Sequence, residues 1–190
     1  MINDMNMRRL RILIAKASGR VRGFTLIETL VAVLLLSTAI AGPLTIASKG
    51  LSATLIARDQ MIAFYLAQDA VEYVRFVRDT NKLSGNSWLA GLDECTGAYG
   101  CTVDPSSGTA DTCPGGGCPL IRKYDDGSGH VYFSYTQGTV TPQQFRRTVT
   151  LAAPPTGEPD EEVLTVAVSW RTQSGVTRAI EVRENLLDWQ

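Results

Sequence analysis

The chain has 190 residues, of which 44% are hydrophobic and 19% charged, and its formal net charge is -1. This length leaves room for one compact domain and one extended element, whereas two independent domains would be crowded. The charge is unevenly divided, because six basic residues and one acid precede Gly23, which leaves twelve bases and eighteen acids in the remainder. The bases of this acidic remainder are scattered and form no stripe with aromatic residues, so we expect no nucleic-acid partner.

Residues 24–47 (FTLIETLVAVLLLSTAIAGPLTIA) form an apolar run whose only ionisable group is Glu28. About 20 apolar residues suffice for a helix to cross a bilayer, so this run can span a membrane. The basic residues lie on its N-terminal side, which predicts that residues 1–23 stay in the cytoplasm and that the rest lies outside. Gly42 and Pro43 predict a kink or local melting of the helix.

Residues 48–80 continue the helical period with an amphipathic pattern. Apolar residues recur at steps of three, four or seven and predict one buried stripe on a water-exposed helix. The members of this stripe are Leu51, Leu55, Ile62, Leu66, Ala70, Tyr73 or Val74, and Val77. A helix that continues from the membrane segment is too long to bury itself in a domain of this size. Half of it must therefore pack against lipid or other subunits.

Residues 81–129 are rich in Gly, Ser, Thr, Asp and Pro, and they predict a long irregular connection. They contain the four cysteines Cys95, Cys101, Cys113 and Cys118. An even number of cysteines in an outward-facing domain favours two disulfides that pin this segment. The sequence does not choose among the three connectivities, although pairing neighbours closes the shortest loops. The alternative is a zinc site, but the cysteine spacings are wider than those of common zinc knuckles.

Residues 130–190 contain four short β-type runs, and the last two are separated by the turn-like segment RTQSG. In the run EEVLTVAVSW, alternation predicts that Leu164, Val166, Val168 and Trp170 face the core. An antiparallel sheet packed on the exposed half of the helix would bury both apolar faces. The predicted fold is therefore α+β, a lollipop with the long N-terminal helix as its stick and a C-terminal antiparallel sheet as its head.

The string Gly23-Phe24-Thr25-Leu26-Ile27-Glu28, after a basic leader and before an apolar helix, resembles the signal sequence of type IV prepilins and pseudopilins. The resemblance implies cleavage after Gly23 by a membrane-embedded prepilin peptidase, followed by N-methylation of Phe24. It further implies that Glu28 forms an assembly salt bridge with the terminal amine of a neighbouring subunit. A carboxylate in a spanning segment is costly and usually marks a functional site with a partner, which agrees with that role.

This resemblance predicts a minor subunit, similar to minor pilins of the PilV type or the pseudopilins of type II secretion. Its expected partners are other pilin or pseudopilin subunits, the prepilin peptidase and N-methyltransferase, the inner-membrane assembly platform, and membrane lipid before assembly. The expected location is the inner membrane as a single-pass protein and then an extracytoplasmic filament. Major pilins often enclose a C-terminal loop with a disulfide, whereas here all the cysteines precede the predicted strands.

Other interpretations have weaker support. A secretory signal peptide or a plain anchor explains the apolar run but not the Gly-Phe-Thr-Leu-Ile-Glu string. A filament-displayed module could contact surfaces or DNA through residues 81–129. Residues 125–129 (DDGSG) contain oxygen ligands that suit calcium, but a polar turn is the simpler interpretation, and we predict no metal or cofactor. An enzyme is not indicated, because His130 is the only histidine and no phosphate loop, HExxH or GxSxG motif is present.

Overall fold

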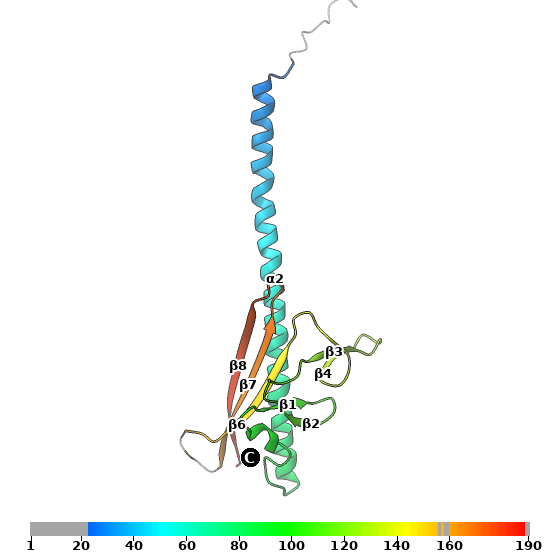
Figure 1. Cartoon of the computed structure of the whole chain (residues 1–190), viewed down its shortest axis with the longest axis vertical. Coiled ribbons are helices and arrows are strands. Elements are labelled where there is room, and N and C mark those ends of the chain that lie inside the picture. The colour runs from blue at the N-terminus through cyan, green and yellow to red at the C-terminus, as the bar shows by residue number, and fades with distance from the viewer. Residues whose placement is uncertain (1–22, 156, 158–159, 189–190) are drawn as a thin grey trace, which may run out of the picture. The chain divides into compact units, whose positions relative to one another are not determined.

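The computed structural model describes residues 23–155, 157 and 160–188. These residues contain one α-helix, one short 3-10 helix and eight strands. Of the predicted leader, residues 1–22 lie outside the described residues. The chain divides into one unit that ends at Gly50 and another that begins at Leu51. Helix α2, Leu26–Leu83, contributes to both (Figure 1).

In the first unit, every residue from Gly23 to Gly50 is exposed. Hydroxyls of this segment are bound within the helix; for example, Ser37, Thr38 and Thr45 each donate to the backbone carbonyl four residues before them. Such bonds satisfy polar groups that would otherwise be costly in an apolar environment. The helix therefore offers its surroundings an almost wholly apolar surface.

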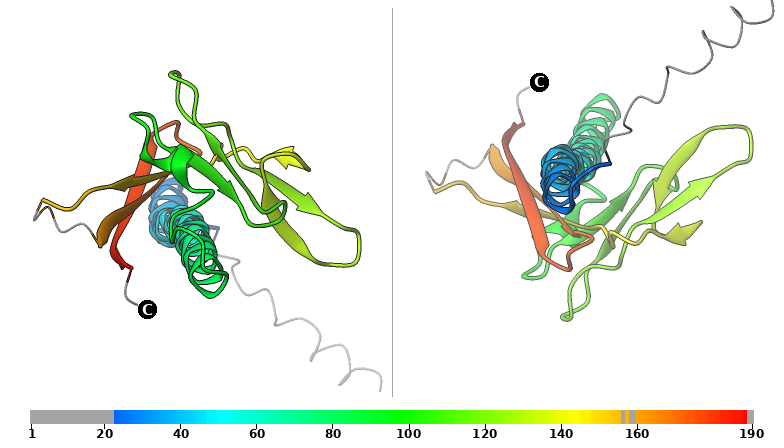
Figure 2. Two further views of the ribbon diagram at one scale, coloured as in Figure 1. Left: turned by 90° about the horizontal axis from the view of Figure 1, so that it is seen from below. Right: turned by 90° about the horizontal axis from the view of Figure 1, so that it is seen from above.

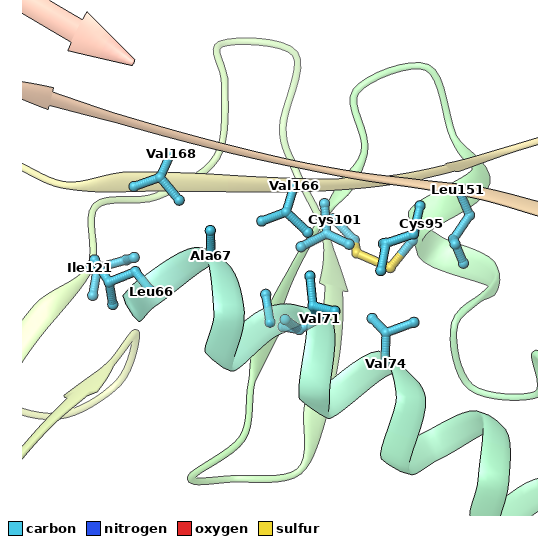
Figure 3. Close-up of a cluster of buried hydrophobic side chains, with 14 of the residues drawn as sticks. Leu66, Ala67, Val71, Val74, Cys95, Cys101, Ile121, Leu151, Val166 and Val168 are labelled. Carbon is cyan, nitrogen blue, oxygen red and sulfur yellow. A yellow bond between two sulfur atoms is a disulfide. The ribbon is translucent and has the colours of Figure 1, made fainter. Parts of the chain in front are cut away.

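In the second unit, α2 packs on the strands through alanines and larger apolar residues at helical spacing. Its buried residues begin at Asp59, and the fully buried ones include Ala63, Ala67 and Ala70, whose small side chains let the strands approach closely. Figure 3 shows Ala67, Val71 and Val74 pointing towards Val166, Val168 and the Cys95–Cys101 disulfide, and Leu66 beside Ile121.

The predicted apolar stripe was only partly right. Leu66, Ala70 and Val74 are buried, but Leu51 is 64% exposed. The periodic pattern extends further towards the N-terminus than the packed part of the helix does. Periodicity could not reveal this limit, because it identifies an apolar face without saying which part of that face is covered.

The larger sheet has five antiparallel strands in the order β2-β1-β6-β7-β8. Its strands are β1 (Cys101–Asp104), β2 (Thr109–Thr112), β6 (Arg146–Ala152), β7 (Glu161–Arg171) and β8 (Thr177–Leu187). β7 and β8 pair along their whole length, from Glu161 opposite Leu187 to Arg171 opposite Thr177, and form the expected hairpin. Leu164, Val166, Val168 and Trp170 are buried, as their alternation predicted.

A second sheet of three strands, in the order β4-β3-β5, was not predicted. It consists of β3 (Arg122–Asp125), β4 (Val131–Ser134) and β5 (Thr139–Val140). In both views of Figure 2, the yellow-green β3–β4 hairpin projects away from β7 and β8. The rings of Tyr124 and Tyr132, which are directly opposite in this hairpin, are stacked with their centroids 5.5 Å apart. Such a cross-strand aromatic pair stabilises strands that bury little.

The interpretation of residues 81–129 as an irregular connection was wrong. The segment contains the 3-10 helix η1 (Asp93–Thr96) and the strands β1, β2 and β3. Each of these strands has only four residues, and their turns are rich in glycine and proline, so the strand period was too short to recognise. The overall class is nevertheless confirmed: one long N-terminal helix combined with antiparallel sheets gives an α+β pilin-like layout.

Candidate functional site at the start of the long helix

Thr25 caps the first turn of α2. Its Oγ1 accepts a hydrogen bond of 3.3 Å from the backbone N–H of Glu28, and its carbonyl accepts one of 3.2 Å from Thr29 N–H. Thr25 is thus the N-cap residue and Glu28 is the third residue of the helix. Threonine followed three residues later by glutamate is the sequence of a capping box, a signal that the sequence analysis overlooked. The cap fixes the turn that carries Glu28.

Glu28 is the acidic residue in the first turn of the helix, and it is exposed. The unpaired N–H groups of a helix start give it a partial positive charge, which favours a carboxylate there. Two residues before the helix, Phe24 is 80% exposed. The structure therefore places Gly23, Phe24 and Glu28 together at one accessible helix end.

Gly23 has open space around it. A Cβ atom built on this residue would meet no atom within 4 Å, and the residue is exposed. No described part of the fold therefore shields the peptide bond between Gly23 and Phe24, and nothing described here would clash with a larger side chain.

The segment after this end is apolar and exposed. An 18-residue window of α2 has a mean hydropathy of 2.2, and none of it is buried within the structure. By length and composition, this helix can cross a membrane. A surface of this kind, with Leu26 at 78% and Leu34 at 62% exposed, must be covered by lipid or by other protein.

Gly42 and Pro43 lie within α2, which continues through them without a break. Both residues are therefore helical in this structure. The kink or local melting expected at this position stays a prediction.

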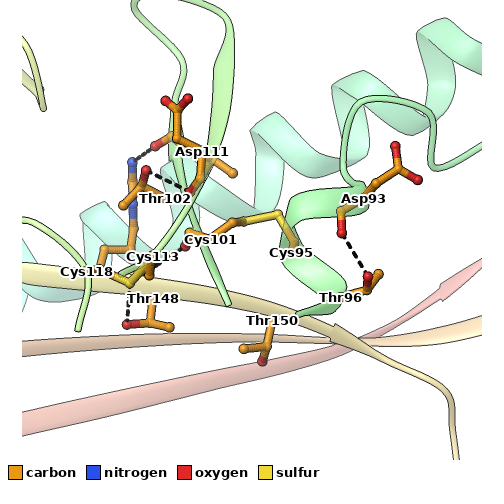
Figure 4. The surroundings of a disulfide bond; sticks show 12 residues. Asp93, Cys95, Thr96, Cys101, Thr102, Asp111, Cys113, Cys118, Thr148 and Thr150 are labelled. Carbon is orange, nitrogen blue, oxygen red and sulfur yellow. Dashed lines mark hydrogen bonds between the residues drawn. A yellow bond between two sulfur atoms is a disulfide. The ribbon is translucent and has the colours of Figure 1, made fainter. Parts of the chain in front are cut away.

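The four cysteines form two disulfides in the second unit, Cys95–Cys101 and Cys113–Cys118. Of the three possible connectivities, this is the one with the shortest loops. All four residues are at most 1% exposed. Figure 4 shows the two bridges side by side near β6, where the Sγ of Cys118 lies 3.1 Å from Thr148 Oγ1. The Cys95–Cys101 bridge connects η1 to β1, and the Cys113–Cys118 bridge closes the loop that follows β2.

Residues 125–129 form a turn whose carboxylates are occupied by nearby donors. Asp125 accepts a bond from Gly127 N–H, and Asp126 accepts bonds from the N–H groups of Ser128 and His130. His130 is exposed, and its Nδ1 lies 3.0 Å from Asp126 Oδ2. Among the described residues, no group of three His, Cys, Asp or Glu side chains could hold a metal ion.

Arg147 is a buried structural residue that the sequence analysis did not single out. It is 2% exposed and donates to Leu66 C=O at 2.7 Å, to Asp69 Oδ2 at 2.9 Å and to the carbonyl of Val103. One side chain on β6 thus links α2 and β1. Alternation could have revealed it, because Arg147 has the same parity in β6 as the buried residues Val149 and Leu151.

Asp104 joins the two sheets. It is 3% exposed, and it accepts bonds from the hydroxyl and N–H of Ser106, from the hydroxyl of Ser134 and from Tyr135 N–H. Burial alone raises the pKa of this carboxyl, but the hydrogen bonds from Ser106, Tyr135 and Ser134 together outweigh burial and lower it below its usual value.

The comparison with known proteins gives a match only around the start of helix α2. The family model described as the prokaryotic N-terminal methylation motif matches residues 19–42. No curated protein matches the chain. No solved structure matches it either. The match covers Gly23, Phe24, Glu28 and the first part of the exposed helix, so over these residues the chain carries the prepilin motif of the type IV pilins and pseudopilins.

Proposed function

We propose that this protein is a minor structural subunit of a type IV pilus-like filament, processed after Gly23 and polymerised through its N-terminal helix. The observation that carries the proposal is the methylation motif at residues 19–42, which coincides with the start of a long, exposed apolar helix. A motif of this kind marks structural subunits, and the apolar helix is a surface that polymerisation would cover.

Processing requires access to one peptide bond. The open space around Gly23 and the exposure of Phe24 are what a membrane-embedded prepilin peptidase needs to cut between them. Cleavage would create a free ammonium on Phe24, which is the group that the N-methyltransferase would modify. The six bases before Gly23 support an orientation in the inner membrane with the leader in the cytoplasm and the second unit outside.

Glu28 would provide the assembly chemistry. A carboxylate at membrane depth costs about 2.5–3.5 kcal/mol on insertion scales, and pairing with a cation relieves this cost. The ammonium of Phe24 in a neighbouring subunit is such a cation. Because both charges sit at defined positions on rigid helices, their attraction would favour one stagger between subunits and thus set the register of the filament.

A minor role is supported by the placement of the disulfides. Both bridges lie between residues 95 and 118, ahead of the β6–β8 strands, and neither encloses the C-terminal part of the chain. A pseudopilin of type II secretion is the alternative assignment. Deleting the gene separates the two: loss of surface pili with intact secretion supports the minor pilin, and loss of secretion with intact pili supports the pseudopilin.

The proposal is tested by co-expression with the assembly machinery and recovery of sheared filaments. We expect the wild-type chain in the filament fraction, and Glu28→Ala to insert and be cleaved but to be depleted there by about tenfold, the effect of roughly 1.4 kcal/mol. Glu72→Ala, which removes a 69% exposed carboxylate later in the same helix, is the matched control and should incorporate normally. Absence of the wild-type chain from filaments would contradict the proposed function, and normal incorporation of Glu28→Ala would contradict the proposed pairing.

A further inference from the structure

A surface groove lies in the second unit between α2, the β1–β2 turn and β4. Its volume is about 310 Å³. The lining comes from three elements: Tyr65, Leu66 and Asp69 of α2, Pro105 and Ser106 of the β1–β2 turn, and Val131, Tyr132 and Phe133 of β4. This volume lies at the lower end of the range for small-molecule sites.

Aromatic side chains form the walls of the groove. Tyr65 is 63% and Tyr132 42% exposed. Tyr132 is held in place from two sides, because its ring stacks on Tyr124 and its hydroxyl donates to Asp126 Oδ2 at 3.1 Å. A ring that is already fixed loses little conformational entropy when a ligand packs against it, so this wall is preorganised for binding.

A carboxylate also lines the groove, that of Asp69. The side chain of Asp69 is about half exposed there, and its Oδ2 accepts a hydrogen bond of 2.9 Å from the buried Arg147. An ionised carboxylate has acceptor sites for more than one donor.

We propose that this groove binds an arginine side chain of a partner protein. A guanidinium is planar, so it can stack on the faces of Tyr65 and Tyr132 while its N–H groups reach the exposed part of the Asp69 carboxylate. Arg147 donates to Asp69 Oδ2, and the arginine of the partner would donate to the half-exposed remainder of the same carboxylate. Neither the methylation motif nor the apolar helix gives this surface a role.

The test uses the full-length chain, isotopically labelled, in detergent micelles, with N-acetyl-arginine amide as the probe. Citrulline has the same shape as arginine without the charge, so N-acetyl-citrulline amide is the matched ligand control. We expect saturable NMR shifts of the backbone amides of Leu66, Ser106 and Phe133, and binding of the citrulline derivative weaker by about threefold or more.

Two variants locate the site. Tyr65→Ala removes an exposed wall residue and should weaken binding of the arginine derivative about threefold, whereas Tyr99→Ala, which removes another tyrosine of 60% exposure outside the groove, should leave it unchanged. Asp69→Asn retains an amide oxygen for Arg147 and should abolish the preference for arginine over citrulline. Spectra of the free variants confirm that each one is folded.

Three results would overturn the proposal: equal binding of the two derivatives, shifts that do not saturate, or the same loss in Tyr65→Ala and Tyr99→Ala. Equal binding would show that the groove is an apolar surface without a preference for cations.

Discussion

The helix before Gly50 exposes its apolar side chains, whereas the unit that begins at Leu51 buries many of its own. In the first, leucines, isoleucines and valines are exposed along the whole segment, and no described part of the fold covers them. In the second, helix residues such as Leu66 and Val74 are packed against strands that two disulfides and a buried arginine hold in place. The apolar side chains of the first region can be covered only by other molecules. The buried ones of α2 in the second unit are covered by strands of the same chain.

The largest effect on the second unit is expected from Arg147→Met. This change removes the cation that bonds Leu66 C=O, Val103 C=O and Asp69, so three hydrogen bonds from one charged donor are lost. We expect a loss of about 3–5 kcal/mol in the free energy of unfolding, measured by urea titration of the full chain in detergent with tryptophan fluorescence. Arg183→Met, at a side chain with 70% exposure, is the control and should change this free energy by less than about 0.5 kcal/mol. A similar small change for Arg147→Met would show that its network does not stabilise the unit.

A matched pair of leucines tests the comparison itself. Leu66→Ala, at 3% exposure, should lower the free energy of unfolding by about 2–5 kcal/mol, because it leaves a cavity between α2 and the strands. Leu34→Ala, at 62% exposure, should leave it unchanged and instead reduce recovery in sheared filaments. If both substitutions destabilised the fold equally in the urea titration, the two regions would not differ as described.

The smallest expected effect is the change of the free energy of unfolding with pH that the Asp104 carboxylate causes. Its pKa lies below the ordinary value of 3.8 in the folded chain, so the ionised form stabilises the fold. That stabilisation is fully present above the ordinary pKa of about 3.8 and is lost as the pH falls through the folded pKa. Asp104→Asn should therefore be less stable than wild type near neutral pH by about 1–2 kcal/mol. The difference in the free energy of unfolding between wild type and Asp104→Asn should become smaller in strongly acidic buffer. A difference that does not change with pH would contradict this role for the carboxylate.

The two regions also differed in how far the sequence could predict them. The apolar run and the string from Gly23 to Glu28 are local signals, so the helix and its candidate site were predicted from adjacent residues. β7 was predicted because eleven residues give enough alternation to define a face. The strands β1 to β3 have four residues each, and their pairing depends on contacts between distant residues. The Tyr65–Tyr132 groove depends on the same distant contacts, and no local pattern encodes it.

The most direct test of the central claim is the intact mass of the chain after co-expression with a prepilin peptidase. We predict a product that begins at Phe24 and carries one methyl group on its amine. Gly23→Ala should block or slow this processing, although the surroundings of Gly23 leave room for the added methyl group, so its effect would reflect recognition by the peptidase. A wild-type chain that keeps its full length under these conditions would contradict the assignment to a leader-cleaved filament subunit.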